Sequence, residues 1–168
     1  ALISTIPNLG SVENEVSKRV RKQYEETPYP RWINTNISDN PKTIVHILKS
    51  INPQLSFDEH NLPESPEILV AGCGTGQQAL NVASEFLKSK VLAMDLSLSS
   101  LSYAKRKMQE LGVNNVEFLQ GDILELNNLN KQFDVIQCTG VLHHMDEPMD
   151  GWRVLVDLLK PGGLMNIG

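Results

Sequence analysis

Five short apolar runs, separated by helix-like segments, lie within residues 67–168, and this alternation limits the possible fold more than any other feature. The runs predict strands at 68–71, 91–94, 116–119, 133–138 and 164–167, and helices are predicted over 77–88, 97–111 and about 151–159. Strands that alternate with helices form a parallel sheet with helices on both faces. We therefore expect a doubly wound, mainly parallel α/β domain over residues 67–168.

Residues 1–66 have a different pattern, which predicts an N-terminal helical segment and linker packed on that domain. One helix is expected over 13–26, where Glu15 and Arg19 are four residues apart and can pair. Two prolines within 28–30 interrupt regular structure, and a second helix is expected to begin at 39–41. At the other end, the chain stops within its last predicted strand, so we expect the α/β domain to be C-terminally truncated relative to the natural protein.

The overall composition argues against two classes of partner. The formal net charge is −5, whereas proteins that bind nucleic-acid phosphates usually carry a basic face, so no nucleic-acid partner is expected. No apolar stretch approaches the roughly 20 residues that cross a bilayer, so no membrane association is expected either. Cys73 and Cys138 are too few for a disulfide scaffold. Free thiols are typical of a reducing compartment, and we expect a cytoplasmic protein.

The segment from Ala71 to Gln77 reads Ala-Gly-Cys-Gly-Thr-Gly-Gln and lies between the first predicted strand and its helix. Glycines at such a turn let a ligand approach the backbone, and the helix N-terminus offers free N–H groups. The dinucleotide fingerprint needs Gly-x-Gly-x-x-Gly, but here the third glycine, Gly76, comes one residue early. The phosphate-loop lysine is also absent after Gly76. The loop therefore lacks the usual supports for a pyrophosphate or triphosphate.

Two carboxylates follow the next two predicted strands. Asp95 ends the second strand, where an acidic side chain can accept both hydroxyls of a ribose. Asp122 lies just beyond the third strand and can accept from an exocyclic amine such as that of adenine. The site thus offers acceptors and negative charge without a basic side chain in the loop. This chemistry suits a ligand with a ribose, an adenine and a cationic sulfonium.

The chain resembles the class I S-adenosylmethionine-dependent methyltransferases, which have a Rossmann-like core. The resemblance is carried, in the order of the family, by residues 68–76, 94–97, 120–123, 133–136, 141–145 and 159–163. A narrower resemblance, in residues 24–32, is to the segment that precedes the methyltransferase domain in some bacterial proteins with tetratricopeptide repeats. Two features depart from the family: Val70 stands where an acidic residue is often found, and the last two strands of the family's sheet are missing.

The resemblance implies S-adenosylmethionine as the cofactor and assigns its parts to strand-end residues. Its methionine part would lie against the loop formed by Ala71, Gly72, Cys73, Gly74, Thr75, Gly76 and Gln77. Its ribose and adenine would contact Asp95, Leu96, Asp122 and Ile123. Thr139 and Gly140 would face its methionine end, and His143 would lie near its methyl group.

The implied activity is transfer of the sulfonium methyl to an acceptor, for which a small molecule is favoured over a nucleic acid. The Asp/Asn-Pro-Pro-Tyr/Phe sequence of enzymes that methylate amines of DNA bases or protein glutamines is absent after the fourth strand, where 138–141 read Cys-Thr-Gly-Val. Two alternatives stay open: a module that binds the cofactor without catalysis, and a nicotinamide-dependent dehydrogenase.

Several side chains have two interpretations. His143 and His144 are adjacent and do not share a helix face, so no metal site is predicted. His143 is either a general base or a packing residue at a helix start. Tyr29 and Trp32 either cover the cofactor or a substrate pocket, or they anchor the N-terminal segment on the domain.

Overall fold

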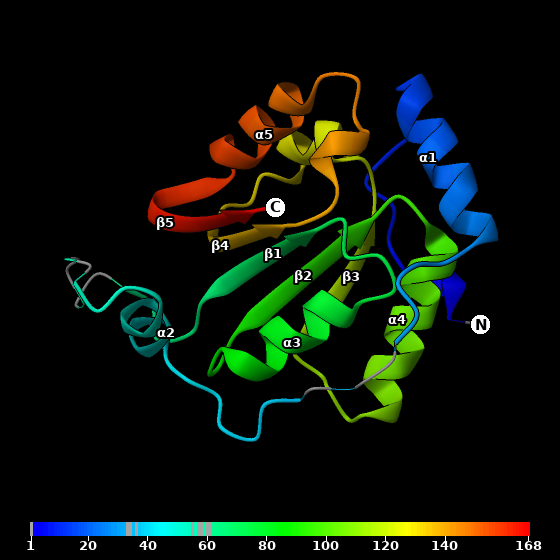
Figure 1. The fold of residues 1–168 in the computed structure, drawn as a ribbon. Helices are drawn as coiled ribbons and strands as arrows, with labels where there is room; N and C mark the ends of the chain where they lie inside the picture. The colour runs from blue at the N-terminus through cyan, green and yellow to red at the C-terminus, as the bar shows by residue number, and fades with distance from the viewer. Residues whose placement is uncertain (1, 33–34, 36, 55, 57–58, 60–61) are drawn as a thin grey trace.

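The computed structural model describes residues 2–168 except 33–34, 36, 55, 57–58 and 60–61. It contains a five-stranded sheet in the order β3-β2-β1-β4-β5, in which all neighbouring strands are parallel (Figure 1). The strands are β1 (Glu67–Ala71), β2 (Lys90–Asp95), β3 (Val116–Gln120), β4 (Phe133–Cys138) and β5 (Leu159–Ile167). The prediction of a doubly wound parallel α/β sheet is confirmed.

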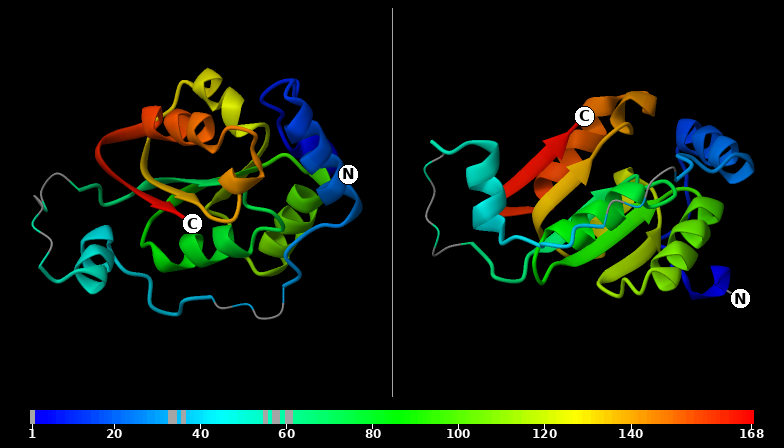
Figure 2. Two further views of the ribbon diagram at one scale, coloured as in Figure 1. Left: turned by 45° about the horizontal axis from the view of Figure 1, so that its top comes forward. Right: turned by 60° about the horizontal axis from the view of Figure 1, so that its bottom comes forward.

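Helices cover both faces of the sheet, as the two further views show (Figure 2). One face packs against α3 (Gln77–Glu85), α4 (Leu98–Glu110) and the apolar side of α2 (Ile44–Ile51). The other face packs against α5 (Pro148–Asp157) and the 3₁₀ segment η3 (Ile123–Leu129). Successive side chains of a strand point to opposite faces. Accordingly, Ile68 and Val70 enter the first cluster of apolar side chains, whereas Leu69 and Ala71 enter the second.

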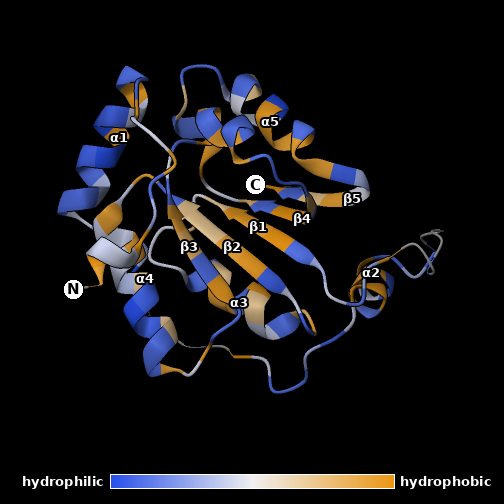
Figure 3. Cartoon of the chain, turned by 180° about the vertical axis from the view of Figure 1, so that it is seen from behind, coloured by the Kyte–Doolittle hydropathy of each residue, from blue (hydrophilic) through white to orange (hydrophobic). Residues whose placement is uncertain are grey.

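The central strands are buried on both sides and are largely hydrophobic (Figure 3). Residues 68–71 of β1 have no exposed surface at all. Such continuous apolar strands are typical of parallel sheets covered by helices on both faces. None of the helices in the described part of the chain is long and apolar enough to cross a lipid bilayer.

The first part of the N-terminal region, residues 7–32, lies at the carboxyl ends of the strands. Residues 7–9 pair with Gln120 at the end of β3: the Leu9 N–H donates to the Gln120 carbonyl, and the Gln120 N–H donates to the Pro7 carbonyl. Helix α1 (Glu15–Glu26) follows and packs on α4. The Asn14 side chain begins α1 by accepting from the N–H groups of its first turn.

Some element boundaries differ from the sequence prediction. Helix α2 begins at Ile44, capped by Thr43, and not at 39–41, because the Lys42 backbone is bonded to the Glu85 carbonyl and the Leu87 N–H. Helix α3 ends at Glu85 rather than at residue 88. Strand β5 begins at Leu159 and not at residue 164, and its pairing with β4 shifts register over residues 159–164.

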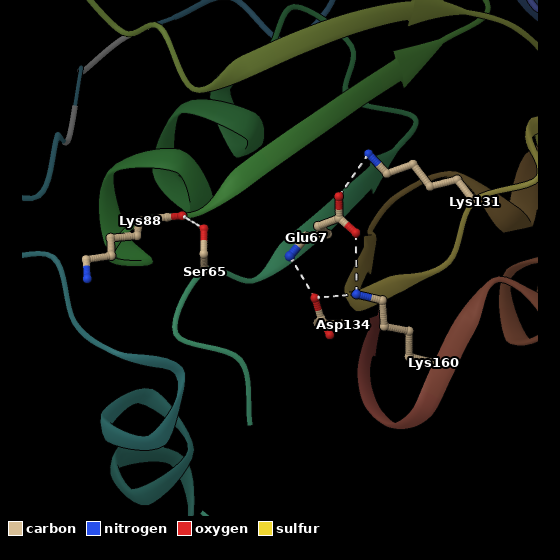
Figure 4. Close-up of polar contacts among 6 residues, drawn as sticks. All are labelled: Ser65, Glu67, Lys88, Lys131, Asp134 and Lys160. Carbon is tan, nitrogen blue, oxygen red and sulfur yellow. Dashed lines mark hydrogen bonds and ion pairs between the residues drawn. The ribbon is translucent and has the colours of Figure 1, made fainter. Parts of the chain in front are cut away.

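Charged side chains form a network of ion pairs at the amino ends of the strands, away from the carboxyl ends (Figure 4). The Asp134 carboxylate accepts from the Glu67 N–H at 2.8 Å and from Lys160 Nζ at 3.0 Å. Lys131 Nζ lies 3.3 Å from Oε1 of the Glu67 carboxylate. Burial and hydrogen bonds to Asp134 and Glu67 act on Lys160 in opposite directions, and its pKa is raised. These contacts join the starts of β1, β4 and β5.

Candidate active site

A cavity of about 590 Å³ lies at the carboxyl ends of the strands. Its floor is the turn after β1, its sides are the turns after β2, β3 and β4, and its cover comes from α1 and residues 29–30. The strand order reverses between β1 and β4, and ligands of open α/β sheets bind at such a switch point. The position of the cavity therefore follows from the topology.

The glycine loop after β1 is held tightly against neighbouring turns. Gly72, Gly74 and Gly76 have φ of 75°, 53° and 90°, a region that favours glycine. The N–H groups of Gly72 and Cys73 both donate to the Met94 carbonyl at 2.9 Å. The loop is therefore fixed to the end of β2, and its backbone lines the cavity without side chains in the way at Gly72 and Gly74.

Asp95 lies between the glycine loop and the start of α4. One carboxylate oxygen accepts from the Gly74 N–H at 2.8 Å, and the other accepts from the Ser97 N–H at 2.9 Å. Burial raises the pKa of Asp95, and the nearby Glu25 charge adds to this, while the backbone N–H donors oppose it. Each carboxylate oxygen has two lone pairs, so Asp95 keeps acceptor capacity that faces the cavity.

Asp122 and Gln120 shape the neighbouring wall. Asp122 is buried, and its side chain accepts from the Leu124 N–H, which starts η3. The Gln120 side chain donates to the Leu96 carbonyl and accepts from the Asn8 side chain, both at 3.1 Å. The Gln120 side chain thus joins the end of β2 to the N-terminal segment, beside the part of the cavity lined by Leu96 and Asp122.

The cover over the cavity has two parts. Helix α1 contributes Val16, Ser17, Val20 and Tyr24 to the lining. Residues 29–32 then run along the glycine loop, where the Thr75 N–H donates to the Tyr29 carbonyl at 3.1 Å and the Thr75 hydroxyl donates to the Pro30 carbonyl. The Trp32 indole N–H donates to the Thr75 carbonyl at 2.9 Å. Trp32 therefore anchors this segment, whereas Tyr29 lines the cavity and is 65% exposed.

His143 and His144 line the cavity from the turn after β4, which is the neighbouring strand of β1. His144 Nε2 is 3.5 Å from the Tyr24 hydroxyl, and the rings of His144 and Tyr24 meet edge to face. Burial and the neighbouring His143 lower the pKa of His144, which favours the neutral ring. Among the residues that the structure describes, no group of three His, Cys, Asp or Glu side chains is arranged to hold a metal ion.

Most of the residues predicted for the cofactor line this one cavity. They are Gly72, Cys73, Gly74, Gln77, Asp95, Leu96, Asp122, Ile123, Thr139 and Gly140, together with His143. Ala71, Thr75 and Gly76 lie behind the cavity wall: Ala71 and Gly76 are buried in the loop, and Thr75 holds residues 29–32. Whether the lining residues contact a cofactor stays a prediction.

Sequence reasoning missed the contribution of α1. The basic residues in its middle suggest a solvated face, and nothing in their spacing indicates the cavity. Only the apolar pair Val16 and Val20, four residues apart, gives a weak sign of a buried side.

Comparison with known families decides the classification. A family model described as "Methyltransferase domain" matches residues 68–163, which is more than half of the chain. This chain belongs to the methyltransferase domain family. The expected resemblance to class I methyltransferases is thereby confirmed, and the glycine loop, Asp95 and Asp122 all lie within the matched range.

Relatives of this methyltransferase domain include proteins with known structures. The structure of PKMT2 from Rickettsia typhi in complex with AdoHcy is similar with a TM-score of 0.64 and 31% identity, over 82% of this chain and 26% of that one. An uncharacterized protein of Synechococcus, syc1184_c, is 37% identical over 61% of this chain and 25% of its own length. A malonyl-[acyl-carrier protein] O-methyltransferase of Halalkalibacterium halodurans is 33% identical over 74% of this chain and 45% of its own. The chain spans less than two thirds of the length of each of these proteins.

Proposed function

We propose that this chain is the S-adenosylmethionine-binding core of a methyltransferase that acts on a small molecule. The observation that carries the proposal is the single cavity into which the glycine loop, Asp95 and Asp122 all face. Support comes from the family match and from the relative in complex with AdoHcy, the demethylated form of this cofactor.

The residues of the cavity fit this cofactor. Asp95 is held by backbone N–H groups in an orientation that leaves lone pairs for two ribose hydroxyls. Asp122 is a buried carboxylate on the same wall, suited to the adenine amine. No Lys or Arg is found among the described residues that line the cavity. Its electrostatics therefore favour a ligand that carries positive charge over one that carries phosphates.

When bound, S-adenosylmethionine supplies a methyl group on a cationic sulfur. The task left to the protein is to align this group with an acceptor and to exclude water, which is a matter of position more than of acid–base chemistry. Thr139, Gly140 and His143 line the side of the cavity reached from β4. We assign to His143 the uptake of the proton that an acceptor hydroxyl or amine loses, since it lines the cavity and is exposed.

A small acceptor is supported by two observations. Relatives are named for actions on small molecules or carrier-bound acyl groups: demethylmenaquinone, trans-aconitate and malonyl-[acyl-carrier protein]. In addition, the cavity lacks the basic side chains, within its described lining, that would track a nucleic-acid backbone.

The test is calorimetric titration of the chain with S-adenosylhomocysteine and, separately, with NAD. We expect saturable binding of S-adenosylhomocysteine and no measurable binding of NAD. Asp95→Ala should weaken the binding by about a hundredfold, as expected from loss of two hydrogen bonds to a charged group. Binding of NAD alone would identify a nucleotide-cofactor site of the dehydrogenase type and refute the proposal. Methyl transfer by the full-length protein, followed with labelled cofactor, then separates an enzyme from a binding module.

A further inference from the structure

The carboxylate of Glu25 joins α1 to the first turn of α4. Its two oxygens accept from the Leu98 N–H at 2.6 Å, from the Ser99 N–H at 3.1 Å and from the Ser99 hydroxyl. The first N–H groups of a helix have no partner within the helix, and an acidic group there is favourable to the helix dipole. The Ser97 side chain accepts from the Ser100 N–H, so Glu25 and Ser97 together satisfy the first turn of α4.

This junction lies next to Asp95 in a continuous chain of hydrogen bonds. Ser97 donates its backbone N–H to Asp95 and its hydroxyl to the Tyr24 carbonyl. The turn 95–97 is therefore held from one side by Gly74, through the Asp95 carboxylate, and from the other side by α1. Glu25 itself is not among the residues that line the cavity.

The same helix that Glu25 fastens also forms the cover. Val16, Ser17, Val20 and Tyr24 line the cavity from α1, and Glu25 is one residue from the end of that helix. Figure 1 shows α1 lying beside the start of α4, close to the ends of the strands. Loss of the Glu25 contacts would loosen both the turn that orients Asp95 and the helix that covers the ligand.

From this geometry we infer that Glu25 is a positioning residue for the adenosyl end of the ligand. It acts through the turn 95–97 and through α1 and makes no contact with the ligand itself. The inference rests on the proposed function, because it concerns the affinity of the same cavity for S-adenosylmethionine and its products.

The first measurement compares affinities for S-adenosylhomocysteine by calorimetry, at a temperature where each variant is fully folded. Glu25→Ala should weaken binding about tenfold, and Glu25→Gln, which keeps one acceptor oxygen but loses the charge, should weaken it less. Glu26→Ala is the matched control, since Glu26 is the exposed neighbour at the end of the same helix. It should bind like the wild type.

A second control separates positioning from general stability. Asp134→Ala breaks the ion network at the opposite end of the sheet (Figure 4) and should lower the free energy of unfolding without changing the affinity. If Glu25→Ala and Glu25→Gln both bind within twofold of the wild type, Glu25 has only a structural role and the inference is overturned. Should Glu25→Ala not fold, the Glu25→Gln value decides alone.

Hydrogen exchange gives a readout that needs no ligand. In the free protein, Glu25→Ala should increase exchange at the amides of Leu98 and Ser99 and along α1, whereas Glu26→Ala should not. Unchanged exchange at these amides overturns the inference even where the wild type binds. If the two variants show this exchange pattern but the wild type does not bind S-adenosylhomocysteine, the junction exists but the proposed function fails, and the positioning role falls with it.

Discussion

Replacement of Gly74 by alanine tests how closely the N-terminal segment is pressed against the glycine loop. A Cβ atom built at Gly74 would lie 2.4 Å from the Tyr29 carbonyl oxygen, far inside van der Waals contact. That oxygen belongs to the backbone, so it can move away only if residues 29–30 move. Their movement would break the two hydrogen bonds from Thr75 to the Tyr29 and Pro30 carbonyls.

The expected loss of stability has two sources. An alanine at φ +53° costs about 1–2 kcal/mol because its Cβ crowds the backbone. The two hydrogen bonds from Thr75 contribute about 1 kcal/mol each. Gly74→Ala should therefore lower the free energy of unfolding by roughly 3 kcal/mol, which would shift the melting temperature of a domain of this size by about 6–12 °C.

Gly112→Ala is the matched control. Gly112 also has positive φ, +70°, but a Cβ atom there would meet nothing within 4 Å. Gly112→Ala should therefore lower the free energy of unfolding only by the cost of the positive φ, about 1–2 kcal/mol. Urea denaturation of both variants measures the difference. Equal losses at the two glycines would mean that residues 29–30 yield freely, and the account of a segment fixed to the loop would be refuted.

Three further predictions follow from other contacts. Ligand binding uses the ionised carboxylate of Asp95, whose pKa is raised by burial. As the pH is lowered, the affinity for S-adenosylhomocysteine should therefore begin to fall at a pH above about 4, the usual pKa of Asp. Asp95→Asn should abolish this dependence in calorimetric titrations across pH. Asp134→Ala should lower the free energy of unfolding by about 2 kcal/mol in urea, since it removes acceptors from the Glu67 N–H and Lys160, and an unchanged value would show that the network contributes nothing. Trp32→Phe keeps a ring but loses the indole donor to the Thr75 carbonyl, so it should cost about 1 kcal/mol by the same assay, with Trp152→Phe on the exposed side of α5 as a neutral control.

The α/β part of the fold was predictable because its signals are local. Ser97 caps α4 and Gly112, with φ +70°, follows its end, as the residue types at those positions indicate. The strands were found because each is an apolar run bounded by turn residues. Where the structure departs, a distant partner is the cause: Lys42 is extended because it pairs with residues 85–87, and nothing near Lys42 in the sequence announces that pairing.

The candidate site was predictable on the side that belongs to the strand ends. Asp95 and Asp122 follow strands whose positions are clear from the sequence, and parallel topology then brings them to the same edge. The N-terminal side was not predictable. Residues 7–9, which precede the first predicted helix at 13–26, pair with Gln120, and Glu25 meets Leu98 across 73 positions. The one ion pair considered on α1 also differs: Glu15 pairs with Lys18 and not with Arg19.

The cover formed by α1 and residues 29–32 has a practical consequence for dissecting proteins of this kind. The family match starts at residue 68, so a fragment cloned to that boundary would retain the strands, the glycine loop and both carboxylates. It would nevertheless lack the cover of the cavity and the Glu25 carboxylate that caps α4, leaving the pocket more open to solvent. A failure of such a fragment to retain its ligand would then reflect the choice of cloning boundary and not the chemistry of the strand ends.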